Sequence, residues 1–208
     1  MTVKSSAHLR TLLGPVLRGA YDVRVSGSHL VPKTGGVLIV SERTGLLDAA
    51  VLSTSLARPV QVAVESRMDF RNDGQWGPLL GRIVKPPGSG LRDVFHRALA
   101  AVYAGDAVGA FPLDRIRREN EASLGFLSAY VSACSGVVVV PVAMAGTHGT
   151  RSTDPPSFRA RIQVTVGGPV ALAPVVDSRS RSHILARAEQ IRQMLADHCA
   201  QARLRMGG

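Results

Sequence analysis

The sequence is poor in cysteine, in aromatic residues and in long hydrophobic runs. It contains two cysteines, and only 4% of its 208 residues are aromatic. Cys134 and Cys199 have neither metal-binding nor redox spacing, so we expect two free thiols, with Cys134 in the core, and no metal site. Few aromatic side chains are present to stack bases and no nucleic-acid-binding motif is found, which argues against nucleic acid as a partner.

No apolar run approaches the ~20 residues that a membrane-spanning helix needs. The longest, Val137–Gly146, is interrupted by Pro141 and is typical of a core strand. The N-terminus lacks the uninterrupted apolar core of a signal peptide. We therefore expect a cytoplasmic protein, and the length and the hydrophobic content of 45% fit one globular domain over residues 1–208.

Lysine is also scarce, although the chain is strongly basic. The formal net charge is +10, and only three of the 25 basic residues are lysines. A GC-rich genome would explain arginine in place of lysine, but it would not explain the excess over acidic residues. This excess predicts an anionic partner, and we favour an anionic membrane surface with the protein peripheral on the inner membrane face.

The N-terminal segment (residues 1–20) predicts an amphipathic helix over Ser6–Gly19. Its leucines recur at helical spacing on one face, with Arg10 and Arg18 beside them. Such a helix either lies on a membrane interface or packs on its own domain, and the sequence leaves both open.

Strand-like and helix-like segments alternate along the rest of the chain, which is typical of α/β proteins. We expect strands at Tyr21–Ser26, Val37–Val40, Val60–Val64, Ala107–Phe111, Gly136–Met144 and Arg161–Val166, and helices at Leu46–Leu56, Leu91–Ala104, Glu121–Ser135 and, within residues 178–206, Arg179–Arg205.

The stretch Gly35–Asp48, GGVLIVSERTGLLD, carries the most chemical information. A short apolar run, Val37–Val40, predicts a buried strand, and a polar turn with Glu42 and Arg43 leads from it into a helix. Asp48 falls in the first turn of that helix. Ligands of open α/β sheets bind at the carboxyl ends of strands, so we expect the functional site here.

This stretch resembles the first motif of the glycerolipid acyltransferases, the glycerol-3-phosphate and lysophosphatidate acyltransferase family. In that family a similar strand leads into Asn-His, four residues and then Asp; here Glu42-Arg43, four residues and Asp48 are aligned. The resemblance runs from about Arg18 to Gly168. It implies a single-domain three-layer αβα fold, with a mixed, mostly parallel sheet flanked by helices.

The other family motifs match at residues that serve the scaffold. Gly81 and Ile83 match the second motif, but its phosphate-binding arginine falls on Pro87 or Pro86; Arg82 or Lys85 could take over that role. In the third motif Phe111 and Pro112 match, whereas the residues that follow are Leu113, Asp114, Arg115 and Ile116 in place of Glu-Gly-Thr-Arg. The Val-Pro-Val of the fourth motif is Val140-Pro141-Val142.

The third motif thus loses the groups that bind the acceptor in the family, while Arg115 remains in a basic cluster that suits anionic headgroups. The resemblance therefore makes Arg82, Lys85, Phe111, Pro112 and Arg115 the candidate substrate-binding residues.

The decisive departure is Arg43, which takes the place of the general base. In the family the histidine deprotonates the acceptor hydroxyl and the aspartate orients it, and the hydroxyl then attacks an acyl thioester. A guanidinium stays protonated at any working pH and cannot accept that proton. The residue pattern favours a catalytically impaired homologue that binds phospholipid or an acyl donor (acyl-CoA or acyl-carrier protein), or that regulates an active acyltransferase. No other cofactor is expected.

The alternative is an active acyltransferase with a rearranged site, acting on a lysophospholipid or a related acceptor. Glu42 is a carboxylate beside the missing histidine, and His148 lies at the carboxyl end of another predicted strand, so either could serve as the base. Asp48 also has a structural explanation, since a carboxylate is favourable in the first turn of a helix. It could pair with Arg43 and fill the site with a salt bridge.

Overall fold

The computed structural model describes residues 13–64, 82–84, 90–114, 126–173, 175, 177 and 180–206. The strands are β1 (Asp22–Ser26), β2 (Val37–Arg43), β3 (Val60–Val64), β4 (Arg82–Val84), β5 (Ala107–Asp114), β6 (Val139–Ala145) and β7 (Arg161–Val166). The helices are α2 (Asp48–Ser55), α4 (Leu91–Tyr103), α5 (Leu127–Ser135), α6 (Arg181–Met206) and the short 3-10 helix η1 (Ser28–Leu30). Residues 13–20 are also helical and lead into β1.

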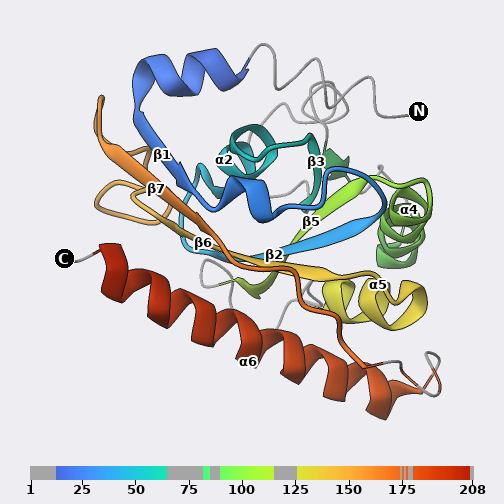
Figure 1. Ribbon diagram of the computed structural model, residues 1–208. Helices are drawn as coiled ribbons and strands as arrows, with labels where there is room; N and C mark the ends of the chain where they lie inside the picture. Colours follow the sequence, from blue (N-terminus) through green and yellow to red (C-terminus); the bar gives the residue numbers. More distant parts are fainter. Residues whose placement is uncertain are drawn as a thin grey trace.

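The described strands form one seven-stranded sheet in the order β1-β7-β6-β2-β5-β3-β4. Every neighbouring pair is parallel except β6 and β7, which are antiparallel. Helix α2 covers one face, and α4, α5 and α6 cover the other (Figure 1). The expected α/β fold with a mixed, mostly parallel sheet between helical layers is therefore confirmed.

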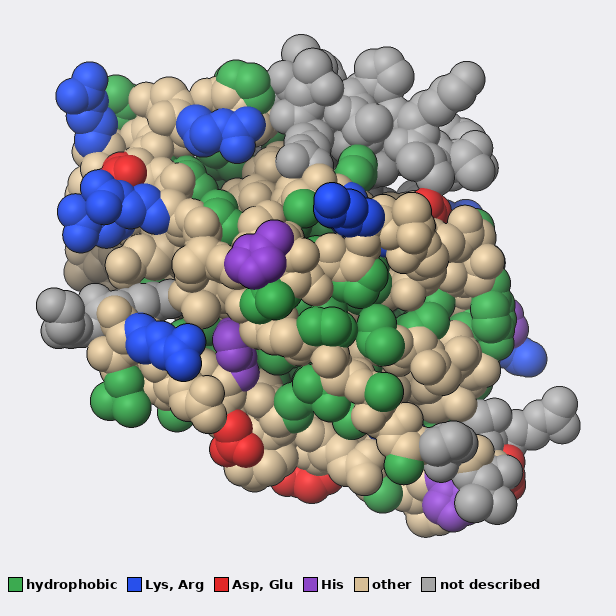
Figure 2. Space-filling view, viewed as in Figure 1, with side chains coloured by type: hydrophobic (Ala, Val, Ile, Leu, Met, Phe, Trp, Pro, Cys, Tyr) green, Lys and Arg blue, Asp and Glu red, His purple; other side chains and the backbone are tan. Residues whose placement is uncertain are grey.

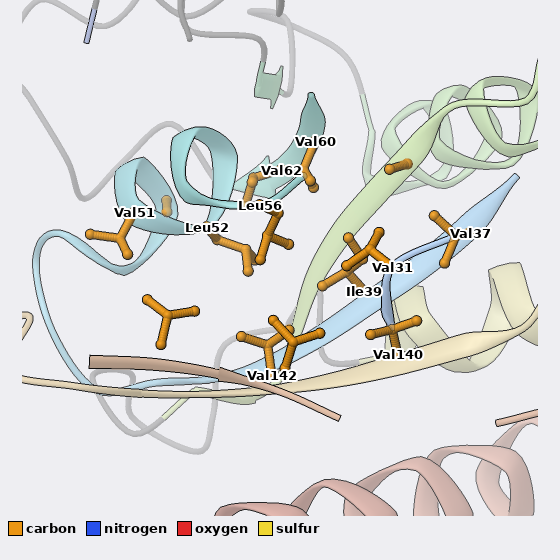
Figure 3. Close-up of a cluster of buried hydrophobic side chains, with 14 of the residues drawn as sticks. Val31, Val37, Ile39, Val51, Leu52, Leu56, Val60, Val62, Val140 and Val142 are labelled. Carbon is orange, nitrogen blue, oxygen red and sulfur yellow. The ribbon is translucent and has the colours of Figure 1, made fainter. Parts of the chain in front are cut away.

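Strand β2 lies at the centre of the sheet, and all seven of its residues are buried. Val37 and Ile39 face α2, whereas Leu38 and Val40 face the opposite helical layer. Figure 3 shows the α2 side, where Leu52 and other side chains of α2 point toward the sheet. A strand covered on both faces needs apolar residues at consecutive positions, which explains the unbroken apolar run in the sequence.

Pro141 lies within β6, an interior strand of the sheet, where proline is usually disfavoured. Its carbonyl accepts a hydrogen bond from Gly167 N at 2.8 Å, just beyond the end of β7. The N–H and the C=O of one strand residue point to the same neighbouring strand. The N–H that proline lacks would therefore also point toward the end of β7, where the regular pairing stops. The ladder loses little, and the ring packs on Gly167, where a Cβ would lie 2.8 Å from Pro141 Cγ.

Several expected details are wrong. Cys199, not Cys134, is the buried cysteine, although both thiols are free as expected. The strand predicted to begin at Gly136 begins at Val139, because Gly136 ends α5 in the left-handed conformation with φ 63°.

Two other boundaries also differ. Strand β5 extends past Phe111 to Asp114. Helix α6 begins at Arg181 and ends at Met206, and its buried stripe includes Cys199 and Ala202.

The predictions for Lys85, Arg115 and the first parts of the helices at Ser6–Gly19 and Glu121–Ser135 lie outside the described residues. Among the helices that are described, none is both long and apolar enough to cross a membrane.

Gly146 fixes the turn that follows β6, and the site described below depends on this turn. Its φ is +78°, and an added Cβ would lie 2.1 Å from the carbonyl oxygen of Arg161 at the start of β7. We expect Gly146→Ala to lower the free energy of unfolding by about 3 kcal/mol, because it combines a left-handed backbone with a backbone overlap. Urea denaturation measures this loss.

The matched control is Gly136→Ala. Gly136 also has a positive φ, +63°, but an added Cβ would meet nothing within 4 Å. The expected loss there is about 1 kcal/mol, from the backbone conformation alone. Equal losses in the two variants would show that the close approach of Gly146 to β7 is unimportant.

Candidate functional site

Charged side chains are buried at the carboxyl end of β2. Glu42 is 6% exposed, Arg43 is 5% exposed and Asp48, at the start of α2, is fully buried. Successive strand residues point to opposite faces of a sheet, so Glu42 and Arg43 lie on different sides. The two faces must therefore be considered separately.

On the α2 side, Asp48 holds together the turn between β2 and α2. Its Oδ2 accepts hydrogen bonds from the backbone N–H groups of Thr44, at 2.5 Å, and Gly45, at 2.7 Å. The N-cap residue Leu47 supplies no side-chain cap to α2. The carboxylate thus gives hydrogen-bond partners to two backbone N–H groups of the turn that precedes α2.

Arg43 lies on the same face as Asp48. Its guanidinium carbon is 5.9 Å from the ring centroid of Phe111, a distance at which a cation is attracted to an aromatic face. Burial raises the pKa of Asp48, and the positive charge of Arg43 opposes part of that rise. In the structure, the position of the expected base therefore holds a buried cation that lies near an aromatic ring and interacts electrostatically with a carboxylate.

Burial nevertheless raises the pKa of Asp48 above its usual value of 3.8. The Thr147 hydroxyl, the N–H groups of Gly45 and Thr44, and the charge of Arg43 oppose this rise without cancelling it. Asp48 Oδ1 and Thr147 Oγ1 are both buried without a hydrogen bond of standard geometry, although the hydroxyl is near enough to act on the carboxylate. Desolvation is the dominant effect.

On the other face, Glu42 binds the C-terminal part of α6. Arg203 Nη2 donates to Glu42 Oε2 at 2.5 Å, and the side chain of Arg203 is 58% exposed. This ion pair joins residues that are 161 positions apart in the sequence. Glu42 therefore faces away from Arg43 and Asp48.

The loop after β6 packs against the β2–α2 turn. A Cβ on Gly45 would lie 2.6 Å from Thr147 Oγ1, and Leu47 N donates to the carbonyl of Thr147 at 3.2 Å. His148 comes next and is exposed, and its Nδ1 lies 2.8 Å from the carbonyl oxygen of Gly149. A carbonyl only accepts, so in this contact Nδ1 carries the proton and Nε2 of the neutral ring is the acceptor.

Strand β5 brings Phe111 and Pro112 beside the end of β2. Phe111 is buried on the α2 face, and Pro112 is half-buried. The register between β2 and β5 shifts by one residue after Val40, so Glu42 pairs with Leu113. Bulges of this kind are common next to functional sites, where they change the direction of a side chain.

The structure therefore brings together Arg43, Asp48 and Phe111, with Pro112 adjacent in the chain. It places Glu42 on the opposite face and His148 on the surface of the neighbouring loop. Arg82 begins β4, and Lys85 and Arg115 lie outside the described residues. No group of metal-binding side chains is found in the described part of the chain.

Sequence reasoning missed Thr147 and Arg203. Thr147 could have been found, because it lies beside His148 at the carboxyl end of a predicted strand. Arg203 gave no such signal, since it is one of several arginines on a long helix.

The raised pKa of Asp48 predicts a pH dependence of stability. The folded state binds this proton more tightly than the unfolded chain does, so the stabilising contribution is present below 3.8 and is lost as the pH rises through the folded pKa. We expect the wild type to lose stability relative to Asp48→Asn as the pH is raised from below 3.8 to neutral. Unfolding free energies of both proteins across this range test it, and a constant difference would contradict it.

The Glu42–Arg203 ion pair predicts that Arg203→Ala lowers the free energy of unfolding by about 1–2 kcal/mol, because a buried carboxylate loses a charged donor. Arg205→Ala, in the same exposed turn of α6, is the matched control and is expected to change stability by less than about 0.5 kcal/mol. Denaturant titration compares the two variants. A loss in Arg205→Ala as large as in Arg203→Ala would mean that the helix end, not the ion pair, is responsible.

No family model and no curated protein sequence matches this chain. Its structure is similar to the crystal structure of the 1-acyl-sn-glycerophosphate (LPA) acyltransferase PlsC from Thermotoga maritima, with a TM-score of 0.63 and 16% sequence identity. The match covers 95% of this chain and 79% of that one. At this identity the likeness establishes the fold, and the acyltransferase-like fold expected from the sequence motifs is confirmed.

Proposed function

We propose that this protein binds phospholipid or an acyl donor on an acyltransferase-like fold, and that it has lost or greatly reduced acyl transfer. The observation that carries the proposal is the buried Arg43, on the same face as Asp48 and against Phe111. A guanidinium is protonated at every working pH, so it cannot take a proton from an acceptor hydroxyl. Loss of a general base costs about 10²–10⁴ in rate.

The surroundings of Arg43 support a binding role. Arginine is well suited to phosphate and carboxylate groups, which it meets with several fixed donors. The PlsC enzyme of similar fold is named for a phosphate-bearing lysolipid, 1-acyl-sn-glycerophosphate. A cation in the former position of the base would attract such an anionic group where the family performs chemistry. Through this binding the protein would sequester lipid or regulate an active acyltransferase.

A second candidate is an active enzyme with a rearranged site, and His148 favours it. His148 follows Thr147, which contacts the β2–α2 turn, and its Nε2 is the acceptor nitrogen when Nδ1 donates to Gly149 O. Glu42 is a weaker candidate for the base, because it faces α6 and is bound by Arg203. In this version His148 would accept the proton of the acceptor hydroxyl.

The test is acyl transfer from acyl-CoA or acyl-carrier protein to a panel of lysophospholipids. We expect no activity above background in the wild type and a gain on the order of 10²-fold in Arg43→His, because the imidazole restores a base near Asp48. Arg43→Met is the control, since it removes the charge at similar length but supplies no base. A gain in both variants would point to relief of charge or crowding rather than to a restored base.

Acyl transfer by the wild type would contradict the proposed loss of activity. Loss of that activity in His148→Ala or in Glu42→Gln would then identify the base. If all variants are silent, binding of monomeric short-chain lysophosphatidate and of acyl-CoA decides the matter. We expect Arg43→Met to weaken binding about tenfold, as loss of a hydrogen bond to a charged group does. Absence of any binding by the wild type would reject the proposed function.

A further inference from the structure

The reversal of β7 brings additional chain segments to the functional end of the sheet. Strand β7 is antiparallel to β6, and β1 is parallel to β7, so β1 and β7 begin where β2 and β6 end. The backbone contact between Gly146 and Arg161 lies at this place. We call this the site end of the sheet, because the β2–α2 turn and the Thr147–His148 loop are also there.

Three exposed segments meet the site end. The helix of residues 13–20 leads into β1, and the turn of residues 157–160 leads into β7. The two are joined by hydrogen bonds from Arg159 N to Ala20 O, 2.7 Å, and from Asp22 N to Ala160 O, 3.0 Å. The last turns of α6 are the third segment, and the ion pair between Arg203 and Glu42 attaches them to the end of β2. In Figure 1 the helix of residues 13–20, the start of β7 and the end of α6 all lie on the left.

Each segment exposes a large apolar side chain. Leu204 is 82% exposed, Phe158 is 73% exposed and Val16 is 62% exposed. Among the described residues only one other large apolar side chain is comparably exposed, Tyr103 at 65%. Tyr103 ends α4, and its hydroxyl donates to Cys134 O at 2.8 Å, which explains its position. The exposure of the other three has no such explanation within the described structure.

Arginines accompany these side chains. The Arg159 guanidinium carbon lies 5.8 Å from the Phe158 ring centroid, Arg18 is exposed on the helix of Val16, and Arg205 follows Leu204 in the last turn of α6. In Figure 2 several Lys and Arg side chains lie on the left of the molecule, with an acidic side chain among the upper ones and apolar side chains at the top and the lower left. We define the docking surface as Val16, Phe158 and Leu204 with Arg18, Arg159 and Arg205.

The charge of the surrounding segments is strongly positive. Residues 13–26 and 147–163 together contain five arginines and two aspartates, and the last turn of α6 adds Arg205 and Arg203, of which Arg203 is paired with Glu42. One of the two aspartates, Asp22, is paired with Arg24 and Arg161. Each cation close to an anionic bilayer contributes about 1 kcal/mol to binding.

We propose that the docking surface binds an anionic phospholipid bilayer through the turn of residues 157–160 and the end of α6, together with the helix of residues 13–20. Single apolar side chains set among arginines suit the boundary between headgroups and acyl chains, where aromatic and aliphatic groups insert and cations meet phosphates. The proposal rests on the proposed function only in that both place lipid at the site end. A bilayer there would present its lipids directly to Arg43 and the neighbouring loop.

The experiment measures co-sedimentation of the full chain with vesicles of equal parts phosphatidylglycerol and phosphatidylcholine, and with vesicles of phosphatidylcholine alone. We expect binding to the anionic vesicles that weakens as salt is raised. Phe158→Ser and Leu204→Ser should each reduce this binding about tenfold, and Arg159→Gln about fivefold. All three side chains are exposed, so the melting temperatures should stay close to that of the wild type.

The matched control is Leu185→Ser. Leu185 is an exposed leucine of the same helix as Leu204, but it lies 19 residues earlier, about 28 Å along the axis and away from the site end. We expect it to bind vesicles like the wild type. Equal effects of Leu185→Ser and Leu204→Ser, or no effect of Phe158→Ser, would overturn the proposal.

The vesicle experiment and the test of the proposed function can fail independently of each other. Binding of monomeric lysophosphatidate depends on Arg43 under the proposed function and should be unchanged in Phe158→Ser and Leu204→Ser. Vesicle binding lost in these two variants supports the docking surface even if the wild type binds no monomeric ligand. If the variants instead dissociate a dimer and leave vesicle binding intact, the surface contacts a second copy of the chain and the proposal fails.

Discussion

The site depends on the carboxylate of Asp48 and on the hydrogen bonds that it accepts from the backbone N–H groups of Thr44 and Gly45. Without these hydrogen bonds the polar turn after β2 would have no side-chain cap, since Leu47 provides none to α2. The same turn holds Gly45 against Thr147, so the loop after β6 is positioned through it as well. Asp48 is therefore needed for the local structure whether or not any reaction occurs. Its presence therefore carries no weight as evidence of catalysis.

Under the proposed function, the alternation of β2 explains why Glu42 cannot easily act as a base in place of Arg43. Glu42 is adjacent in sequence, but its side chain lies on the opposite face, where Arg203 binds it. Turning it toward Asp48 would require a one-residue slip of the central strand, which would move every apolar side chain of β2 to the wrong layer. A base could enter more easily from the loop after β6, because that loop already contacts Gly45 and can vary without disturbing the sheet.

Much of the architecture could be predicted because its causes are local. The run Val37–Val40 has the composition of a strand buried on both faces, and Asp48 has the residue type favoured at a helix start. The burial of Cys199 rather than Cys134 could not be predicted with equal ease. It depends on how far the buried stripe of α6 extends, and the packing against the sheet determines that.

The site was harder to predict, because its contacts also depend on how distant segments pack against the sheet. The Glu42–Arg203 ion pair joins the second strand to the last helix, and no spacing in the sequence records it. The contact of Thr147 with the β2–α2 turn requires a residue without a side chain at position 45, so a glycine that reads as an ordinary turn residue is in fact a point of close approach. Interactions that form only after the sheet is assembled leave little trace in the local pattern.

The antiparallel strand β7 links the site to the proposed docking surface. In a wholly parallel sheet, the segments that precede β1 and β7 would lie at the opposite end from the β2–α2 turn. The reversal of β7, with β1 parallel to it, places the helix of residues 13–20 and the turn of residues 157–160 beside the carboxyl ends of β2 and β6. A surface at that end can take on binding residues without altering the central strands. Changes at Arg43 and changes on the docking surface could therefore accumulate independently, so that a protein which lost the reaction would keep its attachment to lipid.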